Sequence, residues 1–231
     1  MATLELTNST LHYVLMKHVV EKGYAPRLDE LAGILGRSEK EVAGQLDHLA
    51  EEHGVVLHPG THDVWVIHPF SLGPTNFLVK SGGRAWWAGC AWCSLGVVFA
   101  LLKKDAVVKT TNGATGEEVE IRVENGRLLP TNLHVHFPIP MKNAWNNVIY
   151  TDSLILTFEN QQQIEEWCAL HKIPKGDVQP VEKVRRLAEV WYGNHLSPNW
   201  RKWTVQEAGA IFRRFDLSGP IWDLPDSGRR F

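Results

Sequence analysis

The chain has few cysteines, no long apolar run and no excess of basic residues among its 231 residues. Three cysteines, two of them close together, do not suit a disulfide framework and indicate functional thiols in a reducing compartment. No uninterrupted apolar segment approaches the roughly 20 residues that a membrane-spanning helix needs. The 24 Lys and Arg against 26 Asp and Glu give a net charge of −2. That balance argues against a nucleic-acid or membrane partner held by charge.

Two recognisable signals are also missing. Residues 1–6 lack the basic region and apolar core of a signal peptide, so we expect a cytoplasmic protein. Neither G-x-G-x-x-G nor G-x-x-x-x-G-K-[ST] occurs, and we therefore expect no organic cofactor. A hydrophobic content of 44% is ordinary for a soluble globular protein, and the length permits one or two domains with a good core.

Helical periodicity dominates the first part of the chain. Apolar residues recur at helical spacing in three segments, and two short β-like runs then flank a turn-rich stretch. The helical segments are residues 11–22, 28–35 and 38–49, and the β-like runs are 55–57 and 64–67. Three helices followed by a hairpin predict a winged-helix-like unit.

We place this N-terminal domain at residues 1–75 and a second domain at residues 76–231. A winged helix would suggest DNA binding, because its third helix would enter the major groove. That helix, however, carries Lys40 as its one basic residue, against five acidic residues: Glu39, Glu41, Asp47, Glu51 and Glu52. Because these acidic groups would repel phosphate, we expect a structural cover that binds no nucleic acid.

Two of the three cysteines and three of the ten tryptophans lie in one stretch, residues 86–96. An apolar run follows and stops before Lys103, which predicts a buried helix. If Cys90 and Cys93 are both helical, their i, i+3 spacing puts the two sulfurs on one face. Two adjacent thiols in a dry pocket suit a soft metal or a soft electrophile. The residues expected to line this pocket are Trp86, Trp87 and Trp92.

The C-x-x-C motif alone also permits other interpretations. Free cysteine often serves as a small buried hydrophobe. A redox dithiol is disfavoured, because no thioredoxin-like βαβ pattern surrounds the motif. Structural zinc would need a second ligand pair, and the candidates are His134 and His136 on a strand predicted over residues 133–137. Their spacing fits no standard zinc pattern, so their role stays open.

The second half of the chain mixes strand and helix patterns. Strands are predicted near residues 107–110 and 119–123, and another begins after Ser153, with Asp152 at its entrance. An aspartate beside an apolar strand needs a partner, a capping role or a chemical role. Helices are predicted over residues 160–171, 181–192 and 204–215, with Cys168 in the core.

The sequence resembles the organomercurial (alkylmercury) lyase family over roughly residues 10–222, with a tail like that of its longer-tailed branch. The motifs that carry the resemblance occur in the family's order. They are His68-Pro69-Phe70-Ser71, residues 86–96, Thr115-Gly116, residues 151–158 with Trp167, Trp191-Tyr192-Gly193 and Gly219-Pro220-Ile221-Trp222. The resemblance implies an α+β fold, in which the winged-helix-like unit precedes a domain with a small mixed or antiparallel sheet flanked by helices.

One departure from the family concerns its mercury site, which uses a cysteine, an aspartate three residues later and a distant second cysteine. Cys90 matches the first cysteine. Cys93 stands at the aspartate position, and Asp152 stands at the position of the second cysteine. This swap keeps two thiols and one carboxylate. The resemblance therefore implies that Cys90, Cys93 and Asp152 are both the metal ligands and the catalytic residues, with thiolates holding the metal and the carboxylate moving the proton.

The implied activity is that of a carbon–mercury lyase-like enzyme acting on a small organometallic or other soft electrophile, with low-molecular-weight thiols as partners. The metal is then substrate and product, and no cofactor is implied. Two alternatives stay open: a non-catalytic protein that binds copper, zinc or mercury, and a lyase acting on another carbon–heteroatom bond in a specialised pathway. The true substrate, the metal and the choice between monomer and homodimer also stay open.

Overall fold

The computed structural model describes residues 5–225. Its α-helices are α1 (Asn8–Lys22), α2 (Leu28–Leu35), α3 (Glu39–Glu51), α4 (Ala91–Gly96), α5 (Val148–Leu154), α6 (Gln161–His171), α7 (Val181–Trp191) and α8 (Val205–Arg214). A π-helical turn, η1 (Val97–Leu102), continues α4, and a 3-10 helix, η2 (Met141–Asn146), precedes α5. The strands are β1 (Val56–Leu57), β2 (Val64–Ile67), β3 (Phe70–Ser71), β4 (Phe77–Ser81), β5 (Arg84–Ala88), β6 (Ala106–Thr111), β7 (Glu118–Glu124), β8 (Arg127–Leu129), β9 (His134–Phe137), β10 (Thr157–Phe158) and β11 (Asp177–Pro180).

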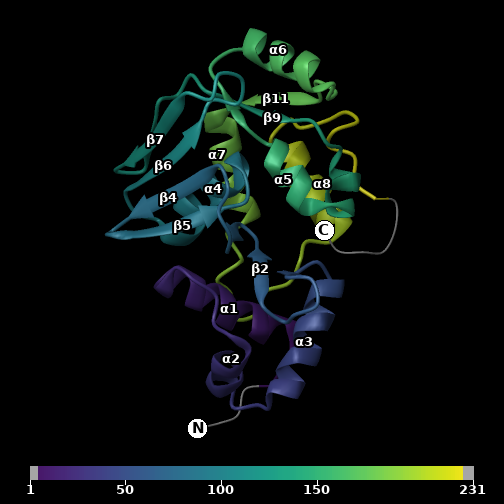
Figure 1. Cartoon of the computed structure of the whole chain (residues 1–231). Coiled ribbons are helices and arrows are strands. Elements are labelled where there is room, and N and C mark those ends of the chain that lie inside the picture. Colours follow the sequence, from purple (N-terminus) through teal and green to yellow (C-terminus); the bar gives the residue numbers. More distant parts are fainter. Residues whose placement is uncertain (1–4, 226–231) are drawn as a thin grey trace.

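The strands form two antiparallel sheets. One has eight strands in the order β1-β2-β3-β5-β4-β6-β7-β8, and the other has three in the order β10-β9-β11. Figure 1 shows α4 and α7 beside the larger sheet, with α5 and α8 on their far side, α6 at one end and α1–α3 at the other. The predicted α+β class with antiparallel sheets flanked by helices is confirmed.

The N-terminal segment contains the predicted three helices and hairpin in the predicted order. Gly23 ends α1 in the left-handed conformation (φ 89°), and Ser38 and Glu41 form a capping box at the start of α3. Beyond the hairpin, β2 pairs with β3 and β3 pairs with β5, so one sheet runs across residue 75. The winged-helix class and the domain boundary at residue 75 stay predictions.

The cysteine-containing helix is buried along almost its whole length. Every residue from Cys90 to Leu101 is buried, and Lys103 ends the helix in the left-handed conformation, as the apolar run predicts. Helix α4 packs on β4 and β5 on one side and on α7 on the other. Gly96 permits the contact with α7, because a Cβ there would overlap the ring of Tyr192.

The segment around Asp152 corrects the sequence analysis. Residues 148–154 form helix α5, whereas the predicted strand is confined to Thr157 and Phe158. Asn147 caps this helix by accepting the N–H of Tyr150 at 3.0 Å. The apolar residues of this segment follow helical spacing rather than alternation, and a helix cap in a short apolar run is easily taken for a turn before a strand.

The remaining predicted elements agree with the structure. Strands β6 and β7 pair along their length, and α6 begins at its Asn160 cap. Cys168 is buried on α6 beside Ile164, so its predicted place in the core is confirmed. Helix α8 opens with the capping box of Thr204 and Glu207. Within residues 5–225 no helix combines the length and apolar character needed to cross a bilayer.

Substituting Gly96 with Ala tests the packing of α4 on α7. The added Cβ would force the ring of Tyr192 to move, so we expect the free energy of unfolding to fall by about 1–3 kcal/mol. Urea denaturation measures the change. Gly33→Ala is the matched control, because a Cβ on α2 at that position meets nothing within 4 Å. A Gly96→Ala variant as stable as the wild type would contradict this packing.

Candidate active site

The two clustered thiols meet at the start of α4. Cys90 is the N-cap of this helix and has an extended backbone (φ −155°), so it is not itself helical. Its sulfur accepts the N–H of Cys93 at 3.3 Å, and the two Sγ atoms lie 3.1 Å apart. The predicted convergence of the sulfurs is therefore present, although it arises from helix capping rather than from a shared helical face.

Asp152 reaches the same place from α5. Its Oδ2 lies 2.9 Å from Nε2 of His68, a residue in the turn between β2 and β3. Ligand atoms of His68, Cys93 and Asp152 all lie within 4.8 Å of one another. The structure thus brings together Cys90, Cys93 and Asp152 and adds an imidazole.

Gly89 makes this close approach possible. A Cβ at Gly89 would overlap the Asp152 carboxylate and would lie 3.4 Å from the Cys93 sulfur. The carboxylate and the thiol therefore both pack directly against the bare Cα of residue 89. Any larger side chain would push one of them away.

Burial controls the protonation of two groups beside this cluster. Burial raises the pKa of the Cys90 thiol well above its usual value, and the neighbouring Cys93 and the charge of Asp152 add to the effect. The Tyr192 hydroxyl lies 3.4 Å from the Cys93 sulfur, and burial likewise raises its pKa well above the usual value. Both groups hold their protons at neutral pH. The Tyr192 hydroxyl is therefore positioned to donate a hydrogen bond to a Cys93 thiolate.

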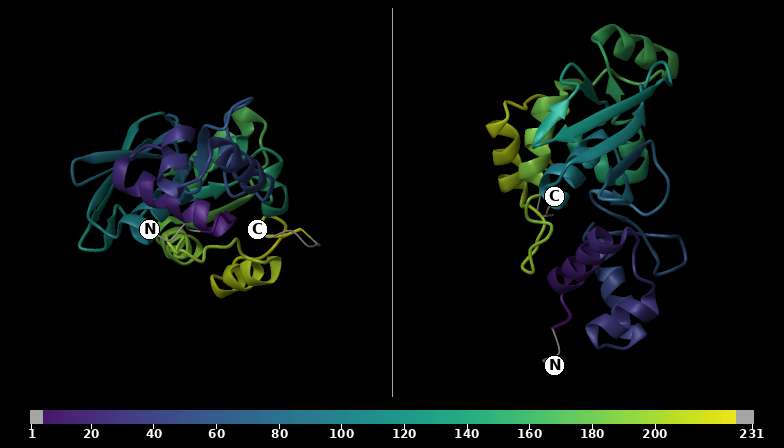
Figure 2. Two further views of the ribbon diagram at one scale, coloured as in Figure 1. Left: turned by 90° about the horizontal axis from the view of Figure 1, so that it is seen from below. Right: turned by 90° about the vertical axis from the view of Figure 1, so that its left-hand side faces the viewer.

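A cavity of about 770 Å³, measured to include its open mouth, leads to this cluster. Three of its polar lining residues, His68, Asp152 and Tyr192, belong to or contact the cluster. Five tryptophans form part of its wall: Trp92, Trp145, Trp191, Trp200 and Trp203. The tail segment between α7 and α8 closes one side, and Figure 2 shows this segment running down to the N-terminal helices. His12 of α1 stacks on Trp200 at 3.5 Å between ring centres.

Of the three predicted pocket tryptophans, Trp92 lines the cavity and the other two do not. Trp86 donates its indole N–H to the carbonyl of Val19 at 2.8 Å and so joins β5 to α1. Trp87 lies on β5 opposite Leu78 and Ser71. The pocket role predicted for Trp86 and Trp87 is therefore wrong. Successive residues of a strand point to opposite faces, and β5 ends before the cluster is reached.

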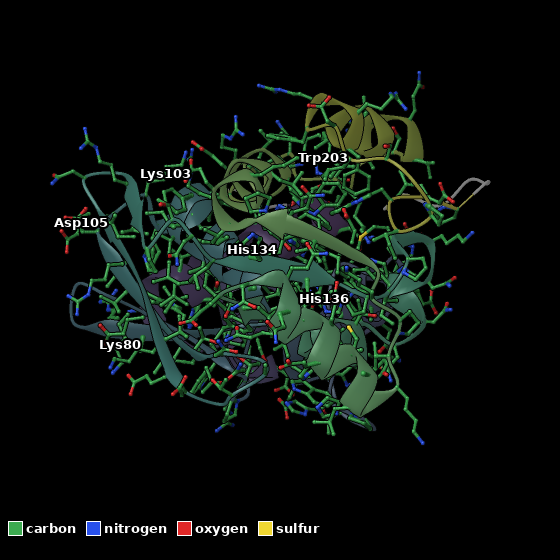
Figure 3. The ribbon with its side chains drawn as sticks, turned by 90° about the horizontal axis from the view of Figure 1, so that it is seen from above. Lys80, Lys103, Asp105, His134, His136 and Trp203 are labelled. Atoms are coloured by element: carbon green, nitrogen blue, oxygen red, sulfur yellow. The ribbon has the colours of Figure 1, made fainter. Side chains whose placement is uncertain are left out.

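The histidines weighed as a second zinc pair lie elsewhere. His134 and His136 are on β9, and His136 packs against Trp167 of α6 with 5.6 Å between ring centres. Its Nε2 contacts the carbonyl of Lys175. Figure 3 shows both histidines at the three-stranded sheet, next to α6. They form no part of the cysteine cluster.

The chemistry of the individual residues in the sequence predicted no site role for His68 or Tyr192. Both stand inside motifs that carry the family resemblance, His68-Pro69-Phe70-Ser71 and Trp191-Tyr192-Gly193. These motifs were the signal in the sequence that could have pointed to the two residues. Nothing in the local sequence connects either residue to Cys93, because the contacts depend on tertiary packing across 24 or more intervening positions.

Comparison with known proteins agrees with this geometry. A family model described as alkylmercury lyase (MerB) matches residues 70–193, more than half of the chain. The chain belongs to the alkylmercury lyase family. The matched span includes Cys90, Cys93, Asp152 and Tyr192, and the predicted enzyme class, a carbon–mercury lyase, is confirmed.

The fold has a counterpart among solved structures. The crystal structure of the mercury-bound form of MerB2 matches with a TM-score of 0.60 and 21% sequence identity. The match covers 83% of this chain and 98% of that one. At this identity the likeness concerns the fold. A search of curated proteins finds no match.

Substituting Gly89 with Ala tests the close packing of the cluster. The new Cβ would displace the Asp152 carboxylate from His68 and Cys93. We expect turnover of phenylmercury, measured as benzene released in excess thiol, to fall roughly 100-fold, as misplacement by about 1 Å can do.

The matched control is Gly44→Ala, since a Cβ at that position in α3 meets nothing within 4 Å. This variant should keep wild-type turnover. If a folded Gly89→Ala variant also kept wild-type turnover, the carboxylate would not need its place beside Cys93.

Proposed function

We propose that this lyase cleaves the carbon–mercury bond of small organomercurials, with Cys90 and Cys93 holding the metal and Asp152 carrying the proton. One observation carries the proposal: the two sulfurs are 3.1 Å apart, and an Asp152 oxygen lies within 4.8 Å of the Cys93 sulfur. Two thiols and a carboxylate are what the reaction needs. Their exchange of positions relative to the family preserves this set.

Cys93 is the first ligand in this scheme. Its sulfur lies near Asp152 and Tyr192, which both line the cavity, whereas the Cys90 sulfur accepts the N–H of Cys93 as the helix cap. An incoming R–Hg–X compound exchanges X for the Cys93 sulfur, and X leaves with the thiol proton. The Tyr192 hydroxyl stabilises the sulfur by donating a hydrogen bond.

Cys90 is the second ligand and the proton source. Its thiol keeps the proton until mercury arrives, because burial raises its pKa well above the usual value. Binding of the Cys90 sulfur to mercury transfers that proton to the Asp152 carboxylate. The carboxyl group then protonates the carbon, whose bonding electron pair comes from the carbon–mercury bond. The products are R–H and mercury(II) held by two thiolates.

His68 serves as a positioning residue. Its Nε2 is 2.9 Å from Oδ2 of Asp152, which fixes the orientation of the carboxyl group. Release of mercury requires exchange with external low-molecular-weight thiols, because soft thiolates are the ligands that compete best for a soft metal.

A non-catalytic soft-metal protein is the second candidate, and one observation favours it. Imidazole, thiolate and carboxylate groups are all zinc ligands, and His68, Cys93 and Asp152 present one of each within 4.8 Å. Such a protein would bind metal without releasing a hydrocarbon. Turnover therefore separates the two candidates.

The test incubates wild type and variants with phenylmercury and excess thiol, and measures benzene release alongside mercury affinity. Cys90→Ser and Cys93→Ser should each lose tight mercury binding and turnover, because each removes one of two thiolates. Asp152→Ala should keep most of the binding but lose turnover by roughly 10²–10⁴-fold, the usual contribution of a positioned proton carrier.

The double variant Cys93→Asp with Asp152→Cys restores the family arrangement and serves as the control for local structure. It should keep or raise the activity. Mercury binding by wild type with no benzene released would refute the lyase proposal and favour the metal-binding candidate.

A further inference from the structure

Lys202, in the tail segment between α7 and α8, forms part of the cavity wall. Its ammonium nitrogen lies 4.2 Å from the ring centre of Trp145 and donates to the carbonyl of His53 at 3.3 Å. A lysine ammonium has three donors, and the hydrogen bonds found among residues 5–225 use one of them. No described carboxylate forms an ion pair with it.

Arg201 and three of the four cavity histidines are engaged or neutral, and the fourth, His53, stacks on Trp145 with 4.6 Å between ring centres. Arg201 forms a two-point ion pair with Glu207, with N···O distances of 2.6 and 2.7 Å. His68 is bonded to Asp152. Burial lowers the pKa of His12 well below its usual value and lowers the pKa of His195 to about 3, so both rings are neutral. Of the two lysine and arginine side chains in the described wall, Arg201 is paired with Glu207 and Lys202 has no anionic partner in contact.

Burial acts on Lys202 as well. Desolvation lowers its pKa to about 7, and the charge of Glu52 opposes this shift without forming an ion pair. A buried ammonium without a counter-ion is unfavourable, and an anion bound beside it would restore the charged form. The Lys202 ammonium thus has hydrogen-bond donors free for an anion, in a cavity whose wall includes five tryptophans.

The position of Lys202 relative to the cluster limits what could bind there. The Trp145 ring is in contact with the Lys202 ammonium, and its centre lies 5.3 Å from the centre of the His68 ring. His68 in turn is hydrogen-bonded to Asp152. One indole and one imidazole therefore separate the cation from the proton carrier. An arylmercury compound with a carboxylate on its ring would bring an anion and a soft metal into this one cavity, and the faces of its ring suit the tryptophans of the wall.

We propose that Lys202 recognises an anionic group at the far end of the organic part of the substrate, so that this lyase favours arylmercury compounds bearing a carboxylate. The inference rests on the proposed function for its kinetic test and on the cavity alone for its binding test. Lys202 acts here as a specificity determinant. The two thiols still bind mercury and Asp152 still carries the proton, as in the proposed function.

The kinetic test compares 4-(chloromercuri)benzoate with phenylmercury chloride. The wild type should prefer the carboxylate, and Lys202→Met should reduce the ratio of the two kcat/KM values by roughly 10–100-fold, the usual effect of a hydrogen bond to a charged group. The change should appear mainly in KM for the carboxylate, because the contact is remote from the reacting carbon. Lys202→Arg should restore most of the preference.

Lys80→Met is the matched control, since Lys80 is exposed on β4 and lies outside the cavity lining. It should leave the ratio unchanged. An equal ratio in wild type and Lys202→Met would overturn the inference.

A binding test without mercury distinguishes failure of the Lys202 inference from failure of the proposed lyase function. Quenching of tryptophan fluorescence by 4-methylbenzoate should show an affinity that falls at least roughly tenfold in Lys202→Met. If neither mercurial is cleaved but this loss is seen, the lyase proposal fails and the anion site stands. If 4-methylbenzoate shows no Lys202-dependent binding, the anion site is refuted.

Discussion

The hydrogen bond from the Cys93 N–H to the Cys90 sulfur is the interaction on which the rest of the site depends. It lets a thiol cap a buried helix, and it brings the two Sγ atoms to 3.1 Å. Because Cys90 is extended rather than helical, the chain before it can turn through Gly89, and the missing side chain at Gly89 leaves room for the Asp152 carboxylate. A single capping arrangement thus creates both the thiol pair and the space for the acid.

The same site also depends on elements from the whole length of the chain. His68 comes from the turn after the N-terminal hairpin, Asp152 from α5 and Tyr192 from the end of α7. The tail segment completes the cavity, and the stacking of Trp200 on His12 holds it against α1. The N-terminal helices therefore contribute to the wall of the cavity, in keeping with a covering role. The buried hydrophobic core is likewise continuous from α1 through the cysteine helix to α8.

The helices with strong local signals could be predicted from sequence, because their caps and apolar stripes are encoded within a few residues. The capping boxes at Ser38 and Thr204 are examples. Helix α5 was missed because its cap, Asn147, precedes a short apolar run that fits either a helix or a strand. Within the site, Cys90 and Cys93 follow from their spacing, and Asp152 follows from the family resemblance. His68, Tyr192 and Lys202 reach the cavity through long-range packing, which no local pattern encodes.

The central claim is that Cys90 and Cys93 replace the family's distant thiol pair as the two mercury ligands. Mercury-edge X-ray absorption tests it most directly, on the protein loaded with one equivalent of mercury(II) and freed of external thiol. The measurement should use a Cys168→Ala background, so that the remaining two cysteines are the sole source of thiolate sulfur. The account predicts two mercury–sulfur bonds at thiolate distance. One sulfur together with nitrogen or oxygen ligands would contradict it, because the two neighbouring thiols would then not act as a pair.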